Sequence, residues 1–304
     1  MTLLHGLIGV GVVEVVRAAD ETGLLEALGQ PDTPAGLAAR LDLSPRVVDL
    51  LLGVLCELGY ATETGGRFGA QQYLTRVDPT WEQVGTFARS GAVAPGIDIS
   101  DDRGANYEES VALLARVFRD PAAELAAELA LAGRVLDIGA GSGIWSLSMA
   151  ARHPSTRVTT LDLEPVLPRV AATARDLGVQ DQVQSRAGNY FHATWEDRFD
   201  RIVLANVLHL ESESDAAALI ARWADHLAPG GELVIVDFFG KPGAYEADLI
   251  RAVYRLHLGM RTEIGKPHSF EELTAWCAQA GLTDQRLISL TSTASAVSAL
   301  VARR

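Results

Sequence analysis

The sequence predicts an α/β fold in which a parallel sheet with crossover helices follows a smaller helical domain. Three observations lead to this prediction. Short runs of β-branched residues alternate with helical segments from Arg134 onward, a pattern typical of parallel sheets. A glycine-rich turn begins at Gly139, directly after the first of these runs. The chain has 304 residues, more than one domain usually contains, so a second domain is expected before the sheet.

Residues 1–80 show the pattern of three helices followed by a hairpin. Thr33-Pro34 and Ser44-Pro45 each place a capping residue before a proline at the first helical position. Thr64-Gly65-Gly66 is a turn signal between two extended segments, residues 60–63 and 67–73. Three helices and a hairpin in this order predict a winged helix.

A winged helix can serve oligomerisation or can place its third helix in the major groove of DNA. Here the third helix, Pro45 to Leu58, carries Arg46 as its one base. The net charge of the whole chain is −13, so its surface repels a phosphate backbone. We therefore expect an oligomerisation domain and no nucleic-acid partner.

Residues 81–132 are predicted to form a helical linker that lines a pocket. A Gly/Asp-rich break at 91–104 suits a loop, and residues 108–130 suit one long alanine-rich helix. Several large side chains here and further along are either acceptor contacts or ordinary core residues: Trp81, Phe87, Tyr107, Phe118, Tyr254 and Met260.

Residues 133–304 are predicted to form the sheet domain. Five runs suit parallel strands, at 135–138, 158–162, 183–187, 202–206 and 233–238. Two final runs, 282–290 and 296–301, flank a Ser/Thr-rich turn and suit an antiparallel pair at the sheet edge.

The glycine-rich turn predicts a ligand site. Gly139, Gly141 and Gly143 follow the strand that contains Asp137, and glycines let the backbone turn sharply and a ligand approach closely. The spacing matches neither the dinucleotide pattern G-x-G-x-x-G nor a phosphate loop ending in Gly-Lys-Ser/Thr.

The ends of the next two strands supply polar partners for such a ligand. Asp162 lies about twenty residues beyond the glycines, where a carboxylate can accept hydrogen bonds from both ribose hydroxyls, although an aspartate here can also cap a helix. Asn189 and Tyr190 end the third strand, where an amide can bond an adenine edge and a ring can cover its face. An ordinary turn with a core aromatic is the alternative.

These motifs resemble the S-adenosylmethionine-dependent small-molecule O-methyltransferases of the caffeate/hydroxyindole type. The resemblance covers nearly the whole chain and rests on the winged-helix pattern, VLDIGAGSG, the Asp162 segment, GNYF, LANVLH, LAPGGELVIVD and GKPHSFEEL. It implies a class I methyltransferase Rossmann-like sheet and a homodimer joined by the N-terminal domain. It also implies a bound S-adenosylmethionine and a small-molecule substrate from secondary metabolism, including antibiotic biosynthesis.

The resemblance assigns the cofactor contacts residue by residue. Asp137 and the three glycines would hold the methionine part and sugar, Asp162 the ribose, and Asn189 with Tyr190 the adenine. Leu163, next to Asp162, is a further candidate cofactor-binding residue. The family usually has aspartate where this chain has Asn189, whose amide oxygen can still accept from the adenine amino group.

His209 is the candidate general base, and it follows the fourth strand at the sheet edge where open α/β folds bind ligands. An imidazole can take the proton of a phenol and make its oxygen nucleophilic. The resemblance places His209 on the family's catalytic histidine and Asp237 on an acidic residue that orients it. A purely structural histidine is the alternative.

Three positions near the base depart from the family. Leu210 and Glu211 replace the Asp-Trp that follows the histidine, and a second acidic position falls on Pro267, with Glu263 nearby. These departures leave open an alternative in which the same fold performs a non-methylating step: cyclisation, elimination, decarboxylation or internal substitution.

Other features bound the location and the cofactors. Cys56 and Cys277 are the only cysteines, and each lies in an apolar helical pattern, which indicates core residues and a cytoplasmic protein. The apolar segment 3–16 is too short to span a bilayer, so we expect no membrane association. His257 and His268 could join His209 in a metal site, but their spacing is long and irregular, and we expect no metal.

Overall fold

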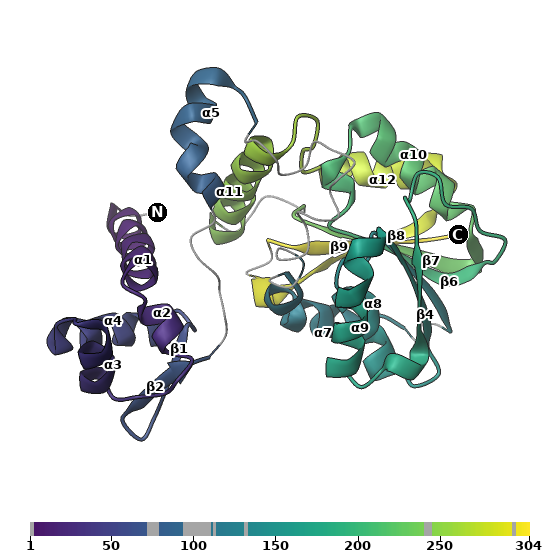
Figure 1. The fold of residues 1–304 in the computed structure, drawn as a ribbon. Helices are drawn as coiled ribbons and strands as arrows, with labels where there is room; N and C mark the ends of the chain where they lie inside the picture. The colour runs from purple at the N-terminus through teal and green to yellow at the C-terminus, as the bar shows by residue number, and fades with distance from the viewer. Residues whose placement is uncertain are drawn as a thin grey trace. The chain divides into compact units, whose positions relative to one another are not determined.

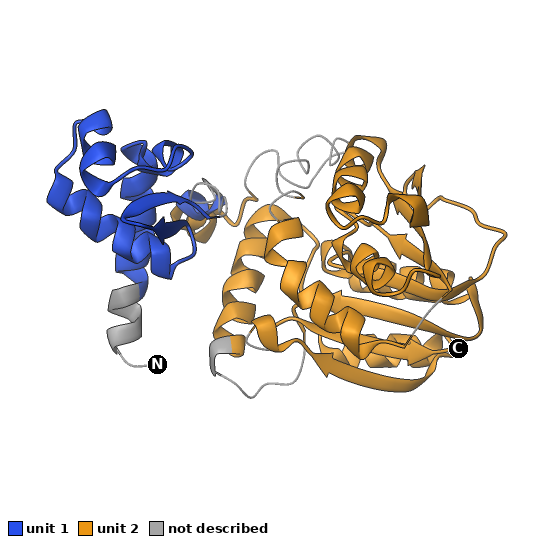
Figure 2. Ribbon diagram, turned by 90° about the horizontal axis from the view of Figure 1, so that it is seen from below, with its two compact units in different colours: residues 1–83 blue, residues 84–304 orange. Residues whose placement is uncertain are grey.

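The structure is a computed structural model that describes residues 3–71, 79–93, 111, 114–130, 133–239, 245–293 and 296–304. The chain divides into two compact units, residues 1–83 and 84–304 (Figure 2). Among the described residues, no helix is both long and apolar enough to cross a membrane.

The described residues of the first unit form four α-helices and a hairpin around a small apolar core that includes Leu24, Leu37 and Leu52. Its elements are α1 (Leu3–Glu21), α2 (Leu24–Ala27), α3 (Pro34–Leu41), α4 (Pro45–Glu57), β1 (Ala61–Thr64), β2 (Arg67–Ala70) and η1 (Pro79–Gln83). The short α2 was not expected. The winged-helix interpretation and the domain boundaries that we derived from the sequence stay predictions.

Local sequence signals explain the turns of this unit. The Thr33 side chain accepts a hydrogen bond from the Gly36 backbone N–H at 3.1 Å, which caps α3, whereas the Ser44 side chain does not cap α4. Gly65 and Gly66 both have positive φ, at 60° and 76°, as a tight two-residue hairpin requires. β2 ends at Ala70, and the rest of the predicted second segment lies largely outside the described residues.

The second unit is built on a seven-stranded sheet with the order β5-β4-β3-β6-β7-β9-β8. The first five of these strands are parallel, and β9 and β8 add the antiparallel edge pair (Figure 1). Their bounds are β3 Arg134–Ile138, β4 Arg157–Asp162, β5 Val183–Ala187, β6 Phe199–Ala205, β7 Leu227–Asp237, β8 Thr283–Ser289 and β9 Ser298–Arg303. The predicted α/β fold is confirmed.

Helices cover both faces of this sheet because alternate strand residues are apolar on both sides. Val135 and Val203 face a core with α7 and α8, whereas Leu136 and Ile202 face a core with α10 and α12 (Figure 1). The helices are α5 Val84–Ser90, α7 Arg119–Glu128, α8 Ile144–Arg152, α9 Leu167–Asp176, α10 Glu213–Ala224, α11 Tyr245–Arg261 and α12 Phe270–Gln279, with short turns η2 Glu164–Val166, η3 Gln180–Gln182, η4 Leu208–Leu210 and η5 Thr291–Thr293.

Two predicted elements have different bounds. The single helix expected at 108–130 is wrong within its described part, because helical residues 114–117 end at a turn at Phe118 and α7 begins at Arg119. Pro121 explains the interruption, since it has no N–H for the carbonyl of residue 117 and its ring crowds that carbonyl. β7 begins at Leu227, six residues earlier than predicted, because Leu227 pairs with Phe199 across a bulge.

Candidate active site

The glycine turn after β3 has the conformation that its sequence predicts. Gly139, Gly141 and Gly143 have φ of 63°, 58° and 73°, a region that side chains with a Cβ rarely adopt. A Cβ on Gly139 would lie 2.7 Å from Cγ2 of Val207, so a larger residue here would displace the Val207 side chain.

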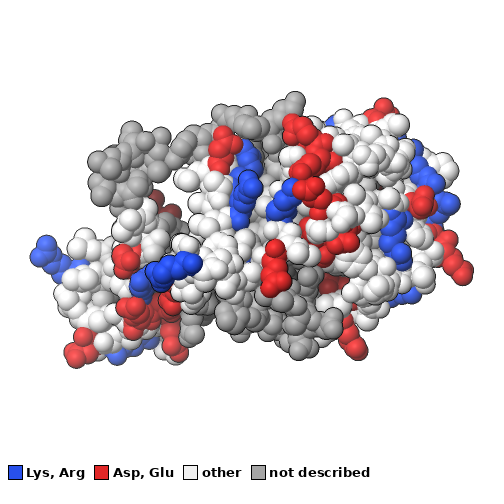
Figure 3. Space-filling model, turned by 90° about the horizontal axis from the view of Figure 1, so that it is seen from above, with Lys and Arg blue, Asp and Glu red and all other residues white. Residues whose placement is uncertain are grey.

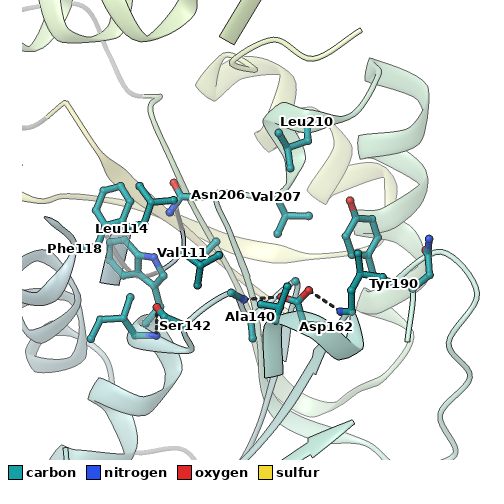
Figure 4. A pocket seen from close by; sticks show the side chains of 18 of the residues that line it. Val111, Leu114, Phe118, Ala140, Ser142, Asp162, Tyr190, Asn206, Val207 and Leu210 are labelled. Carbon is teal, nitrogen blue, oxygen red and sulfur yellow. Dashed lines mark hydrogen bonds between the residues drawn. The ribbon is translucent and has the colours of Figure 1, made fainter. Parts of the chain in front are cut away.

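Asp162 joins the end of β4 to this turn. Its Oδ2 accepts a hydrogen bond from the Gly141 N–H at 2.6 Å and its Oδ1 from the Leu163 N–H at 2.7 Å (Figure 4). Burial raises the pKa of Asp162, and the two backbone hydrogen bonds oppose that shift. Each carboxylate oxygen has a second lone pair, so the group can still accept from two further donors.

Asp137 lies behind the turn and is 2% exposed. Its Oδ2 accepts from the Ser146 hydroxyl at 2.5 Å. Burial raises the pKa of Asp137 to about 7, with the Ser146 hydrogen bond lowering it and the charge of Asp162 raising it further.

A pocket opens at the carboxyl ends of β3, β4 and β6, where strand order reverses around β3. It encloses about 940 Å³, including its open mouth. Figure 4 shows its lining, which consists of Val111, Leu114, Phe118, Gly139–Ser142, Ile144, Trp145, Asp162, Leu163, Val166, Gly188–Tyr190, Ala205–Val207 and Leu210.

The structure brings six predicted cofactor residues to this pocket: Gly139, Gly141, Asp162, Leu163, Asn189 and Tyr190. Asp137 and Gly143 lie behind the lining. The Asn189 Oδ1 accepts from the Phe191 N–H at 2.8 Å, which closes a local turn, and the Tyr190 hydroxyl donates to Glu211 at 2.6 Å.

Asn206 lines the same pocket and was missed by the sequence analysis. It has a φ of 56°, and its buried Oδ1 has no hydrogen-bond partner among the described residues. Figure 4 shows its side chain at the pocket wall. An asparagine directly after a buried strand tolerates positive φ better than most residues, and that was the available signal.

The two predicted catalytic residues are bonded to one another and lie outside the pocket lining. His209 is 5% exposed on η4, and its Nδ1 lies 2.8 Å from both carboxylate oxygens of Asp237 at the end of β7. The Phe238 N–H donates to Asp237 Oδ1 at 2.7 Å. Val207 and Leu210, on either side of His209 in the sequence, do line the pocket.

The segment from Gly265 to His268 holds the η4 turn from outside. A Cβ on Gly265 would lie 2.5 Å from the His209 carbonyl oxygen, so only glycine fits at this distance. The His268 Nε2 lies 2.9 Å from the Leu208 carbonyl oxygen, and Lys266 pairs with Glu213 and Glu272. GKPHSF therefore braces the turn that carries the candidate base.

The residues that depart from the family pattern do not contact His209 through the hydrogen bonds described. Leu210 lines the pocket and Glu211 holds the Tyr190 hydroxyl. Glu263 is exposed and lines a second pocket with Phe87 and Thr262, while the hydrogen bonds described for His209 go to Asp237 and Tyr254.

The large side chains considered as acceptor contacts lie in different parts of the structure. Phe118 lines the main pocket, Tyr254 bonds His209 and Met260 is a core residue. Trp81 belongs to the first unit, and Tyr107 lies outside the described residues. In the parts of the chain that are described, no three His, Cys, Asp or Glu side chains are grouped as metal ligands.

Comparison with known proteins identifies the sheet domain. Residues 135–231 match the family model described as a methyltransferase domain. Over 326 aligned residues the chain is 25% identical to 3-hydroxy-5-methyl-1-naphthoate 3-O-methyltransferase of Streptomyces sahachiroi, a match that covers 96% of this chain and 92% of that protein.

Solved structures share the fold over the full length. Human N-acetylserotonin methyltransferase in complex with SAM is 20% identical with a TM-score of 0.73, covering 100% of this chain and 98% of that one. Mitomycin 7-O-methyltransferase is 23% identical with a TM-score of 0.71, covering 99% and 96%. The domain match shows that residues 135–231 form a methyltransferase domain, and the chain is similar over nearly its whole length to an O-methyltransferase that acts on a naphthoate.

Proposed function

We propose that this chain transfers the methyl group of S-adenosylmethionine to a hydroxyl of a small aromatic or polyketide-like secondary metabolite, with His209 as general base. One observation carries the proposal: His209 is hydrogen-bonded to Asp237 at the carboxyl edge of the sheet, and Val207 and Leu210, on either side of His209 in the sequence, line the pocket. The naphthoate relative supports an aromatic hydroxyl as acceptor. The non-methylating alternative finds no support in these comparisons.

The donors and acceptors of the pocket fit this cofactor. Asp162 can accept from ribose hydroxyls, and the unpartnered Oδ1 of Asn206 is an acceptor suited to an ammonium group. The positive-φ glycines leave the space that a Cβ would fill. Tyr190, steadied by Glu211, offers a ring face for adenine. When bound, the cofactor supplies an electrophilic methyl group on a sulfonium.

His209 and Asp237 would handle the proton of the acceptor. Because the carboxylate of Asp237 accepts hydrogen bonds, Nδ1 of His209 carries the hydrogen and Nε2 carries the lone pair. Nε2 can then receive the acceptor proton, and Asp237 stabilises the resulting imidazolium. Holding the acceptor and the bound cofactor next to one another would supply much of the remaining rate enhancement.

We also propose a homodimer in the cytoplasm without a nucleic-acid partner. Apolar side chains are exposed on α1, α4 and α11, among them Val10 at 65% and Leu50 at 62%, and such side chains favour burial against a second copy. The cysteines described are unpaired, which suits a reducing compartment. On the face shown in Figure 3, basic side chains are scattered among acidic ones.

Cofactor binding is tested by calorimetry on the full chain and on Asp162→Ala. The variant loses the ribose acceptor and should bind S-adenosylmethionine roughly 10- to 150-fold more weakly, as expected for hydrogen bonds to a charged group. Arg303→Gln, on β9 away from the pocket lining, is the control and should bind normally. Absence of binding by the unaltered chain would refute the proposed function.

The role of His209 is tested by turnover of hydroxynaphthoates with S-adenosylmethionine. His209→Gln should lower kcat by roughly 10²- to 10⁴-fold and leave cofactor affinity unchanged. A nitro-substituted hydroxynaphthoate, already ionised, should partly restore turnover. Full activity in His209→Gln would show that another group removes the proton.

A further inference from the structure

Tyr254 meets the candidate base at the nitrogen that the proposed reaction uses. It lies on α11, and its hydroxyl oxygen is 2.8 Å from Nε2 of His209, opposite the bond to Asp237. The two rings are perpendicular, at 86° with centroids 5.4 Å apart. His209 therefore has a hydrogen-bond partner at both ring nitrogens.

The direction of these bonds follows from their chemistry. The Asp237 carboxylate fixes the hydrogen of the neutral ring on Nδ1, so Nε2 can only accept. The Tyr254 hydroxyl is then the donor to Nε2. A hydroxyl that donates its hydrogen keeps two lone pairs, so Tyr254 can itself accept a hydrogen bond from another hydroxyl.

Tyr254 is held in place by an aromatic row that begins at the pocket. Its ring stacks on Phe238 at a centroid distance of 3.9 Å and an interplanar angle of 18°. Phe238 packs edge-on against Phe118 at 6.2 Å, and Phe118 packs against Trp145 at 5.3 Å. Phe118 and Trp145 line the pocket, so the row leads from the pocket wall to the Tyr254 ring.

The hydrogen bond between Tyr254 and His209 distinguishes the two groups that could meet an acceptor. His209 is 5% exposed, and the Tyr254 hydroxyl already occupies the lone pair of its Nε2. An acceptor hydroxyl must therefore displace the tyrosine hydroxyl to reach Nε2, whereas it can bond the tyrosine oxygen directly.

We propose that Tyr254 is a catalytic residue that relays the acceptor proton to His209, an inference that rests on the proposed function. The acceptor O–H bond breaks as its proton passes to Tyr254 Oη, and the Tyr254 proton passes to Nε2 of His209. S-adenosylmethionine, when bound, would supply the methyl group: the acceptor oxygen would bond the methyl carbon as the methyl–sulfur bond breaks, and the electron pair of that bond would stay on sulfur. Tyr254 ends unchanged, and the imidazolium returns its proton to solvent.

Tyr254→Phe is the direct test, because it removes the hydroxyl and keeps the ring that stacks on Phe238. With S-adenosylmethionine and 3-hydroxy-2-naphthoate as probe, kcat should fall by roughly 10- to 100-fold, within the range of acid–base effects, with unchanged cofactor affinity. A nitro-substituted, already ionised hydroxynaphthoate should be turned over within about threefold of the unaltered rate, since its proton needs no relay. Tyr60→Phe in the first unit is the matched control and should change neither rate.

Two further measurements separate a relay from a cover over the base. The proton inventory in mixed H₂O and D₂O should show two transferred protons in the unaltered chain and one in Tyr254→Phe. The ¹⁵N spectrum of the chain without acceptor, with His209 assigned by His209→Gln, should show Nε2 losing its hydrogen bond in Tyr254→Phe. If the Tyr254 hydroxyl merely occupies Nε2 of His209, Tyr254→Phe should free that nitrogen, raise turnover and leave the inventory unchanged, which overturns the relay.

The outcomes also distinguish this inference from the proposed function. If Tyr254→Phe matches the unaltered chain on both phenols while His209→Gln is inactive, the relay is wrong and the proposed function stands. An unchanged Nε2 resonance in Tyr254→Phe would equally overturn the relay. If the unaltered chain binds no S-adenosylmethionine, the proposed function fails and the relay fails with it.

Discussion

Asp137 should make the sheet domain lose stability as pH rises, and Asp137→Asn should remove that loss. Burial raises the pKa of Asp137 from 3.8 to about 7. The folded state therefore binds more protons than the unfolded state between these values, and stability falls as pH rises through that window. At about 1.4 kcal/mol for each pH unit, the full cost above pH 7 is about 4 kcal/mol. About 3 kcal/mol of it develops between pH 5 and pH 8.

Asparagine retains an oxygen for the Ser146 hydroxyl but does not titrate, so the comparison isolates the charge. Urea unfolding without cofactor, followed by tryptophan fluorescence, is the assay, since Trp145, Trp195, Trp223 and Trp276 all lie in the second unit. Between pH 5 and 8 the free energy of unfolding should fall by about 3 kcal/mol more in the unaltered chain than in Asp137→Asn. Ser146→Ala removes the hydrogen bond that lowers the pKa of Asp137, so the loss of stability with rising pH should be larger in this variant. Equal pH dependence in the unaltered chain and Asp137→Asn would refute the reasoning.

Two further substitutions test the packing around the site. Gly265→Ala places a Cβ 2.5 Å from the His209 carbonyl oxygen, so it should displace η4 and lower kcat at least about tenfold. Calorimetry should show normal cofactor affinity in this variant. Gly259→Ala is the control and should leave kcat unchanged, because its Cβ would meet only Phe87, at 3.8 Å. Equal kcat in the two variants would show that the brace does not position the base. Glu232→Gln leaves Arg201, which is 3% exposed, without its counter-charge and should lower the free energy of unfolding in urea by about 3–5 kcal/mol. Arg303→Gln removes a partner that is 51% exposed and should lower it by under about 1 kcal/mol. Burial raises the pKa of Glu232, but Arg201 and Arg303 outweigh it and hold that pKa below its usual value. The stability that the Glu232 carboxylate contributes should therefore be present above about pH 4.5 and be lost as the pH falls further. If the free energies of unfolding of Glu232→Gln and the unaltered chain differ by the same amount at every pH, this expected pH dependence is wrong.

The sheet could be predicted from the sequence because its strands are short, apolar on both faces and separated by helices. The pattern located all seven strands, and the glycine turn marked the end of β3 correctly. Bounds failed where a specific contact overrides the pattern. Gly231 lets β7 start early, since a Cβ there would lie 2.9 Å from the Ala228 carbonyl oxygen and 3.0 Å from that of Phe199.

The contacts of the candidate site were less predictable, because they join residues far apart in the chain. Tyr254 and His209 are 45 positions apart, and nothing in the helical pattern of α11 marks Tyr254 as the residue that faces the base. The unpartnered Oδ1 of Asn206 is likewise a property of the folded pocket. Sequence patterns predict elements from local periodicity, whereas these contacts depend on which helix faces pack together.

The segment from Val207 to Glu211 connects the cofactor pocket with the candidate base. Val207 fills the space beside Gly139, Leu210 lines the pocket, His209 bonds Asp237 and Glu211 fixes the Tyr190 hydroxyl. The chain has Leu210 and Glu211 where the resembled family has Asp-Trp, yet both side chains contribute to the pocket rather than to the base. Support for His209 comes instead from Asp237, Tyr254 and the Gly265–His268 brace. The altered motif is therefore compatible with a retained base, because the groups that orient the imidazole lie on β7, α11 and the brace rather than beside it in the sequence.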